Sequence, residues 1–333
     1  MATGVATVRV EADDGDLRVD RWFRRHYPTL SHGRLEKLLR TGQVRVDGGR
    51  VKAGDRLAVG QIVRVPPLPA AELAAPKIRT TSEHLPTPAE LRLGDDLRDA
   101  VVHRDKLVIA LNKPAGLAVQ GGSGTAVHVD GMLDYLRFEA RERPRLVHRL
   151  DKDTSGLLLL GRTVAAAAKL VDAFRQRDTI KEYWAIVVGA PPADSGRIDL
   201  ALAKTVAGRH GGEQMVVDEK NGDRAVTDYE VADRAGRKLT LVVLRPVTGR
   251  THQLRVHCAE MGTPILGDGK YGGAQAFEGM LEGAGGLHLH AARLTLPNPA
   301  GGMLKLYAEP SPHFRATMTS FGFDPPREGG GFR

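Results

Sequence analysis

A loop of charged and hydroxyl residues, flanked by two apolar runs, is the segment of this sequence best suited to chemistry. It reads LVHRLDKDTSGLLLLGRT over residues 146–163 and carries Arg149 and Asp151. The apolar runs are typical of buried strands, and loops at strand ends often hold reactive side chains over a rigid scaffold. The alternative is a polar turn in which the Asp151 carboxylate only accepts hydrogen bonds from nearby backbone N–H groups.

Two further segments carry side chains that are able to contact a substrate. KEYWAIVVG, residues 181–189, contains Tyr183, which is either a substrate contact or a core aromatic residue with a satisfied hydroxyl. VTGRTHQLRVHC, residues 247–258, brings four basic side chains to the predicted start of a helix, either as part of a site or as a solvated helix face: Arg250, His252, Arg255 and His257.

Other chemistries find little support in the sequence. NKPAGLAVQGGSG, residues 112–124, lacks the glycine spacing and the final GK[ST] of a phosphate-binding loop, so we expect no nucleotide cofactor. The 12 histidines form no HExxH motif and the chain has no CxxC pair, so we expect no metal. Cys258 lies within the predicted helix and is better explained as a core residue. Thr154 and Ser155 are expected to brace the loop that contains Asp151.

The elements that must hold these segments fall into four parts. Residues 17–65 form a small unit of two short helices and several short strands, and the proline-rich residues 66–100 are a linker. Strand and helix patterns alternate over residues 101–315, and the tail over residues 316–333 is weakly patterned. Pattern alone therefore predicts an α+β protein with two folded parts.

One helix of the small unit has a distinct basic face. Ser31 is its expected N-cap and Gly42 its expected C-terminal stop. Leu35, Leu38 and Leu39 share the face that packs inward. The opposite face carries three basic residues, which are Arg34, Lys37 and Arg40.

The composition narrows the class of protein. The chain has 333 residues, 41% of them hydrophobic, so a sizeable core is possible, and its formal net charge of +8 favours a polyanion as partner. One cysteine allows no intrachain disulfide framework. We find no apolar run long enough to span a membrane and no signal peptide at the start, and we expect a cytoplasmic protein without a membrane partner.

Together these segments resemble the RluA/RluC/RluD family of pseudouridine synthases. HRLDKDTSGLLLL matches the family's HRLDxxTSG signature, KEYWAIVVG matches its KxYxAxVxG strand, and PVTGRTHQLRVH followed by GTPILGDGKYG matches its third motif block. The resemblance extends over about residues 17–310, in the same order and spacing. NKPAGLAVQGGSG is similar to the C-type branch, which modifies large-subunit ribosomal RNA.

The resemblance implies both the fold and the roles of individual residues. It implies an alpha-L RNA-binding domain over residues 17–65, followed by a catalytic domain with a mixed, mostly antiparallel sheet and flanking helices. Asp151 is implied as the catalytic residue, with Arg255 as the cation beside it. Tyr183 and Leu254 are implied to contact the target uracil and Arg149 to hold the flipped nucleotide. The implied RNA contacts of the small domain are Arg34, Lys37, Arg40 and Arg45.

The implied reaction converts selected uridines of 23S ribosomal RNA to pseudouridine. It needs no redox change and no net energy input, so we expect no cofactor. It does need an ionised carboxylate in a dry pocket, and because burial alone neutralises such a group, we expect Arg255 within salt-bridge reach of Asp151. Attack on the sugar, attack on the base and elimination across the ribose all stay open. We expect the enzyme to act as a monomer.

Two other functions are compatible with parts of the sequence. A non-catalytic RNA-binding or ribosome-assembly factor would use the same basic domain, but it has no need of a buried carboxylate facing its polyanion. A metal-dependent RNA hydrolase would need a set of metal ligands whose spacing the sequence lacks.

Overall fold

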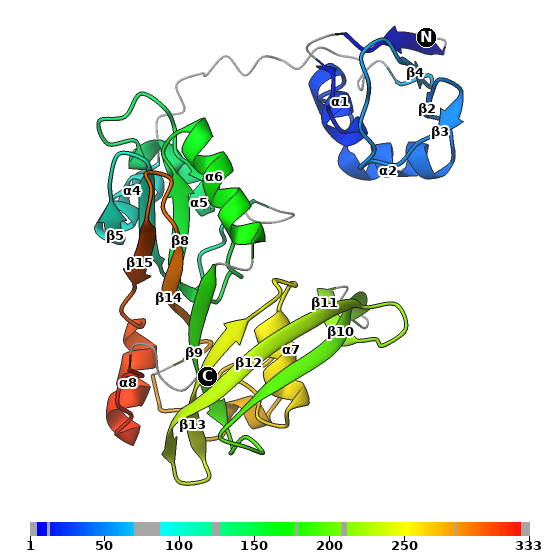
Figure 1. Cartoon of the computed structure of the whole chain (residues 1–333). Coiled ribbons are helices and arrows are strands. Elements are labelled where there is room, and N and C mark those ends of the chain that lie inside the picture. The colour runs from blue at the N-terminus through cyan, green and yellow to red at the C-terminus, as the bar shows by residue number, and fades with distance from the viewer. Residues whose placement is uncertain are drawn as a thin grey trace. The chain divides into compact units, whose positions relative to one another are not determined.

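The computed structural model describes residues 5–11, 14–69, 87–121, 127–176, 179–207, 212–283 and 285–327. The chain divides into two compact units, unit 1 (residues 1–85) and unit 2 (residues 86–333) (Figure 1). Part of the predicted linker, residues 70–86, and the glycine-rich end of the chain, residues 328–333, lie outside the described residues.

The described part of unit 1 combines two helices with a small antiparallel sheet, whose strand order is β1-β4-β2-β3. Trp22 and Phe23 of the first helix are buried in its core. Its elements are β1 (Ala6–Arg9), α1 (Val19–His26), α2 (His32–Arg40), β2 (Arg45–Val46), β3 (Gly49–Arg50) and β4 (Ile62–Val65).

Helix α2 follows its sequence pattern closely. The Ser31 hydroxyl accepts a hydrogen bond from the backbone N–H of Arg34 at 3.3 Å, which caps the first turn. Gly42 follows the helix with a φ of 69°, a conformation that favours glycine. The three leucines predicted to pack inward are all buried, namely Leu35, Leu38 and Leu39. The prediction for this helix is therefore confirmed.

Unit 2 contains a large mixed sheet with helices packed against it. Its helices are α4 (Pro88–Asp99), α5 (Val129–Met132), η2 (Leu133–Leu136), α6 (Val164–Arg175), α7 (Gln253–Glu260), η3 (Gln275–Phe277) and α8 (Pro312–Phe321). Its strands are β5 (Val101–Arg104), β6 (Val108–Lys113), β7 (Arg145–Leu146), β8 (Ser155–Gly161), β9 (Ile180–Val188), β10 (Ser195–Ala207), β11 (Gly212–Val217), β12 (Asp223–Ala235), β13 (Leu239–Pro246), β14 (Leu289–Pro297) and β15 (Met303–Tyr307).

The strand order of the large sheet is β11-β10-β12-β13-β9-β14-β8-β6-β5, with β15 also paired to β14 and β7 to β8. Strands β14 and β8 run parallel, and the other pairs among the described strands are antiparallel. The predicted α+β class with a mixed, mostly antiparallel sheet is confirmed. The parallel pair lies near the middle of the sheet, where the loop with Asp151 enters β8.

The two faces of β9 pack against different helices, because side chains alternate along a strand. Trp184 and Ile186 lie in a buried cluster with Phe314 of α8. Ala185 and Val187 lie in another cluster with Leu254 and Cys258 of α7, on the face to which Tyr183 also points. Figure 1 shows α7 beside β12 and β13, and α6 along β8. The alternation therefore brings Tyr183 to the α7 side of the sheet.

The structure differs from the predicted boundaries at both ends of unit 2. Helix α4 lies inside the predicted linker of residues 66–100. Its Thr87 hydroxyl accepts from the Glu90 N–H and the Glu90 carboxylate accepts from the Thr87 N–H, which forms a capping box with Pro88 in the first turn. Proline marks a helix start here, and we had interpreted it as a sign of a linker.

Helix α8 crosses the predicted start of the tail at residue 316. Phe314, Thr317 and Met318 are buried, and Phe323 beyond the helix is buried as well. The weak sequence pattern at the start of this tail reflects a short helix that buries the polar Thr317 beside the apolar Phe314 and Met318.

Candidate active site

The sheet register brings two of the predicted site segments together. Gly156 of β8 pairs with Ala291 of β14, and Ala291 pairs with Tyr183 of β9. These three residues therefore form one row across adjacent strands, which lie about 4.8 Å apart in a sheet. The loop with Asp151 immediately precedes β8, so it enters the sheet two strands away from Tyr183.

The end of the HRLDKDTSG signature fits this close packing of strands. Gly156 has a φ of 107°, and a Cβ atom at this position would lie 2.3 Å from the carbonyl oxygen of Ala291. Only glycine fits such an approach. The Ser155 hydroxyl lies 2.8 Å from Nδ1 of His290 in the buried interior, which gives Ser155 a structural partner.

The start of the signature is divided between packing and the site. Nε2 of His148 accepts a hydrogen bond from the backbone N–H of Leu159 at 2.9 Å, and its ring stacks on Phe174. Burial lowers the pKa of His148 to about 3, so the ring is neutral. Arg149 is exposed and lines the same hollows as Asp151. The signature therefore alternates residues that build the loop with residues that face the cavity.

Asp151 makes a turn with its backbone and leaves its side chain open. Its carbonyl oxygen accepts from the Thr154 N–H at 3.2 Å. Within the described residues, the carboxylate makes one ion pair, 3.9 Å from Oδ1 to Nε2 of His252. The side chain is 26% exposed. The alternative in which the carboxylate caps local N–H groups is therefore not what the structure shows.

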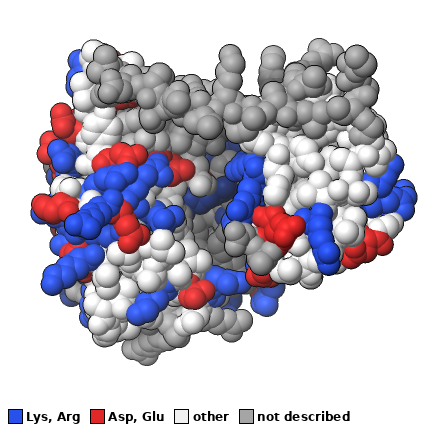
Figure 2. Space-filling model, turned by 90° about the horizontal axis from the view of Figure 1, so that it is seen from above, with Lys and Arg blue, Asp and Glu red and all other residues white. Residues whose placement is uncertain are grey.

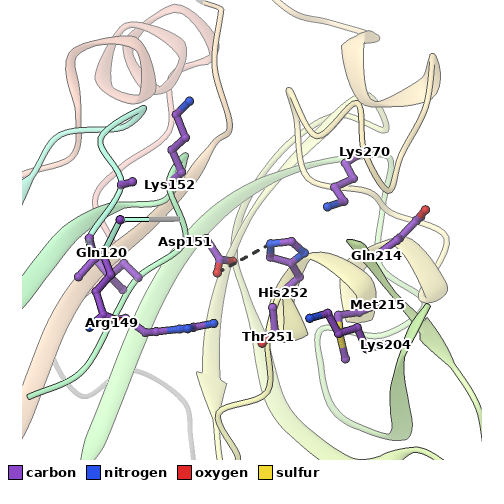
Figure 3. Close-up of a pocket in the computed structure, with 14 residues that line it drawn as sticks. Gln120, Arg149, Asp151, Lys152, Lys204, Gln214, Met215, Thr251, His252 and Lys270 are labelled. Carbon is purple, nitrogen blue, oxygen red and sulfur yellow. Dashed lines mark ion pairs between the residues drawn. The ribbon is translucent and has the colours of Figure 1, made fainter. Parts of the chain in front are cut away.

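Two adjoining cavities meet at Asp151. One, of about 540 Å³, is lined by Arg149, Lys152, Lys204 and Lys270 among others. The second, of about 420 Å³, is lined by the five residues predicted to act on the substrate, which are Arg149, Asp151, Tyr183, Leu254 and Arg255. Figure 3 shows Asp151 facing His252, with Lys204 and Lys270 across the first cavity.

Tyr183 and Leu254 give the second cavity its apolar wall. Tyr183 belongs to β9 and Leu254 to α7, and the two lie in one hydrophobic cluster. Burial raises the pKa of the Tyr183 phenol, and the negative charge of Asp151 raises it further. The phenol is therefore neutral, and its ring stands as a flat surface beside a carboxylate.

The expected salt bridge between Arg255 and Asp151 is wrong. The Arg255 guanidinium donates to both carboxylate oxygens of Asp268, at 2.8 and 2.6 Å, and both side chains are buried. This bidentate geometry is the strongest that arginine and a carboxylate form. Arg255 still lines the cavity beside Asp151 and acts on it through space.

Four residues around Asp151 received no individual role from the sequence. His252 forms the 3.9 Å ion pair with its carboxylate, and in the sequence it was one of four basic side chains without a role of its own. The other three are the lysines of the larger cavity, Lys152, Lys204 and Lys270. Lys204 and Lys270 come from distant parts of the chain, so only the folded sheet brings them to this loop.

Lys113 has a structural role within the segment NKPAGLAVQGGSG. Residues 122–124 of this segment lie outside the described residues. Its side chain is fully buried, and its ammonium donates to the carbonyl oxygens of Pro114, Leu117 and Lys152 at 2.7, 2.9 and 3.0 Å. Burial lowers its pKa to about 8. The lysine ties this segment to the backbone next to Asp151.

No group of three or more His, Cys, Asp or Glu side chains suited to a metal ion occurs within the described ranges. Among the helices of the same residues, none combines the length and the apolar character that crossing a membrane requires.

The fold and this site are those of an RNA-modifying isomerase. Residues 107–260 match the family model for RNA pseudouridylate synthase. Over 301 residues the chain is 36% identical to ribosomal large subunit pseudouridine synthase C of Escherichia coli (strain K12), covering 90% of each protein. The chain belongs to the pseudouridine synthase family.

Two other proteins extend the comparison. RNA pseudouridine synthase 4, mitochondrial, of Arabidopsis thaliana is 37% identical over 298 residues, which cover 80% of this chain and 62% of that protein. The chain therefore spans less than two thirds of the plant protein's length. The structure of human RNA pseudouridylate synthase domain containing 4 superimposes with a TM-score of 0.60 at 29% identity, covering 72% of this chain and 99% of the human one.

Proposed function

We propose that this protein isomerises specific uridines of large-subunit ribosomal RNA to pseudouridine. Its relative from Escherichia coli is named a ribosomal large subunit pseudouridine synthase. The observation that carries the proposal is the Asp151 carboxylate, open to a cavity whose walls are an aromatic ring and a leucine. We further propose that the enzyme works as a monomer in the cytoplasm.

The chemistry needs few groups. The bond between uracil N1 and ribose C1′ breaks, the base turns, and a bond forms between C5 and C1′. The hydrogen on C5 then leaves as a proton, and N1 takes up a proton in its place. Atoms and electrons balance without an oxidant or an energy source. The Asp151 carboxylate serves as the nucleophile or base of this sequence, and it starts by attack on the sugar, attack on the base or elimination across the ribose.

The walls of the cavity suit a base that turns over during the reaction. Stacking on Tyr183, with Leu254 as a second apolar contact, holds a ring by its face and leaves its edges free to rotate. Stacking of one base on an aromatic side chain contributes about 1–3 kcal/mol. Tyr183 also has a proposed part in removing the proton from C5 after the base has turned.

A uridine in a paired region reaches this cavity only when it leaves the helix. Such extrusion costs a few kcal/mol and is cheapest for weakly paired bases. Arg149 is exposed at the boundary of both cavities, where its long side chain holds the extruded nucleotide or fills the gap it leaves.

The larger cavity provides a path for the RNA backbone next to Asp151. Its rim carries four cations, Arg149, Lys152, Lys204 and Lys270, and phosphate contacts of this kind position RNA without selecting its sequence. The face of the molecule in Figure 2 carries Lys and Arg side chains interspersed with Asp and Glu. The charges on that face therefore do not identify the path of the RNA by themselves, and we assign the path to the cavity next to Asp151.

Unit 1 supplies further RNA contacts. Lys37 and Arg40 are exposed on α2, while Arg34 and Arg45 are half-buried. Arg45 also donates to the carbonyl oxygens of Gly42 and Gly48, at 3.2 and 2.9 Å, so it braces the turn between β2 and β3. We assign Lys37 and Arg40 the larger share of RNA binding and Arg45 a mixed role.

The test is to map pseudouridines in large-subunit RNA from cells with and without the gene. We expect specific pseudouridines to disappear in its absence and to return when the purified protein acts on that RNA. The same protein should release tritium from RNA labelled at uridine C5. An unchanged map together with no tritium release would contradict the proposal and favour a non-catalytic RNA-binding factor.

A further inference from the structure

His252 stands at the junction of the two cavities, at the N-cap of α7. Its backbone lies in the left-handed region, with φ 51° and ψ 18°, and its side chain makes no capping hydrogen bond to the helix. A residue with a Cβ atom pays for this conformation, and such strain persists where the surrounding structure enforces it at a functional site. Helix capping therefore does not explain a histidine here.

The ring of His252 is fixed from one side. Its Nδ1 lies 2.6 Å from the hydroxyl of Tyr271, and the two rings meet edge to face at 5.6 Å. The same hydroxyl accepts a hydrogen bond from the backbone N–H of Met215 in β11 at 3.2 Å. With one lone pair of the hydroxyl taken by Met215, we assign its single proton to Nδ1 of His252, which uses the donor as well as the acceptor capacity of the hydroxyl.

That hydrogen bond determines where the imidazole keeps its own proton. Burial lowers the pKa of His252 and outweighs the charge of Asp151, which raises it. The nearby cations Arg255 and Lys270 lower it further and Asp268 opposes them, and the net shift leaves the ring neutral at neutral pH. A neutral ring that accepts at Nδ1 carries its hydrogen on Nε2. Nε2 is the atom that faces Oδ1 of Asp151, at 3.9 Å (Figure 3).

We propose that His252 is a positioning residue for Asp151, with its Nε2–H directed at one carboxylate oxygen and its tautomer fixed by Tyr271. This proposal rests on the proposed function, because it gives Asp151 the central role. The 3.9 Å separation is longer than a hydrogen bond, and such contacts shorten when substrate fills a site. Holding Oδ1 leaves the other oxygen to face the ribose and uracil in the cavity.

The first test compares three substitutions of His252 by kcat, KM and thermal unfolding. A glutamine amide reaches the place of Nε2, whereas an asparagine amide reaches only the place of Nδ1. We expect His252→Gln to keep more of kcat than His252→Asn, with the latter reduced about 10- to 100-fold, as for other groups that orient a reacting side chain. KM for RNA should change little, and His103→Gln, on the edge strand β5, is the matched control.

A purely structural role predicts the opposite order, because asparagine tolerates the left-handed conformation better than glutamine. Equal kcat values, a higher value for His252→Asn, or a loss confined to KM would overturn the proposal. His252→Gly guards against misfolding, since glycine suits a φ of 51°. We expect it to unfold no earlier than wild type and to lose kcat, and wild-type kcat in this variant would also overturn the proposal.

The second test concerns the tautomer. Tyr271→Phe removes the hydroxyl and keeps the ring, so we expect kcat to fall severalfold in the wild-type background and to stay unchanged in the His252→Gln background. Independent, additive losses would mean that Tyr271 does not act through His252. Failure of the proposed function would show as a wild-type protein that forms no pseudouridine, whereas failure of this inference needs an active wild type and unaffected variants.

Discussion

Two aspartates of unit 2 are held in opposite ways. Asp268 is 1% exposed, accepts from Arg255 with both carboxylate oxygens, and accepts further from the backbone N–H groups of Lys270 and Tyr271 at 3.2 and 3.3 Å. Asp151 is 26% exposed, and the one ion pair of its side chain within the described residues is the 3.9 Å contact with His252.

The difference separates a carboxylate that builds the protein from one that is available to a substrate. A buried carboxylate whose oxygens are both occupied has no free position for a substrate. Removing it leaves its arginine partner as an uncompensated buried charge. A carboxylate at the junction of two cavities keeps its lone pairs open. Arg255 lies between these two cases, since it is paired with Asp268 and lines the cavity of Asp151.

The largest expected effect comes from removing the open carboxylate. Asp151→Ala should lower pseudouridine formation by more than about 1,000-fold, the scale on which a site loses its central reacting group. RNA affinity and the unfolding temperature should stay close to wild type, because the side chain makes no short contact in the described structure. Filter binding and thermal unfolding check this, with Asp153→Asn on the exposed side of the same loop as control. A strongly destabilised Asp151→Ala protein would contradict the conclusion that this carboxylate, unlike that of Asp268, has no structural role.

Asp268→Asn should show the reverse pattern. It leaves Arg255 as a buried, uncompensated cation, so we expect the free energy of unfolding to fall by about 3–5 kcal/mol. Activity per folded molecule should fall less than in Asp151→Ala. Urea unfolding combined with active-fraction assays measures both quantities. If Asp268→Asn unfolded like wild type, the structural role of this aspartate would be wrong.

Buried histidines should make the fold sensitive to acid. Burial lowers the pKa values of His288 and His290 to about 4, below the usual 6.5. The folded state therefore favours the neutral rings. Their contribution to the free energy of unfolding is complete above pH 6.5 and is lost as the pH falls from 6.5 toward 4. Each ring steepens this loss by up to about 1.4 kcal/mol per pH unit. Urea unfolding at a series of pH values checks the slope, and His32→Gln, an exposed position, should not alter it.

The smallest expected effect belongs to single phosphate contacts. Lys37→Ala in unit 1 should weaken RNA binding severalfold and reduce the slope of log affinity against log salt by about 0.7–0.9. The rate at saturating RNA should not change, which contrasts with Asp151. Titrations at several salt concentrations check this prediction. Lys52→Ala removes the same charge from an exposed loop of unit 1, and an equal change there would argue against a specific contact at Lys37.

Local pattern was sufficient to predict much of this molecule. The apolar runs around residues 146–163 predicted the strand that follows the loop, β8. The motifs further identified five of the residues that line the smaller cavity.

The errors arose where pairing depends on the fold. Arg255 and Asp268 are 13 residues apart, and their contact requires the turn after α7 to return to the helix. His252 was treated as one of several basic residues, since its approach to Asp151 depends on a backbone conformation that no local pattern reveals. Helix α4 was missed because prolines suggested a linker, whereas the Thr87 and Glu90 capping box starts a helix there.

The most direct measurement is single-turnover release of tritium from uridine C5 in large-subunit RNA, with protein in excess, for wild type and Asp151→Asn. Asparagine keeps the size of the side chain and removes its charge. We predict release by wild type and none above background by Asp151→Asn while the RNA stays bound. Release by the variant within about tenfold of the wild-type rate would contradict the assignment of Asp151 as the group that carries the reaction.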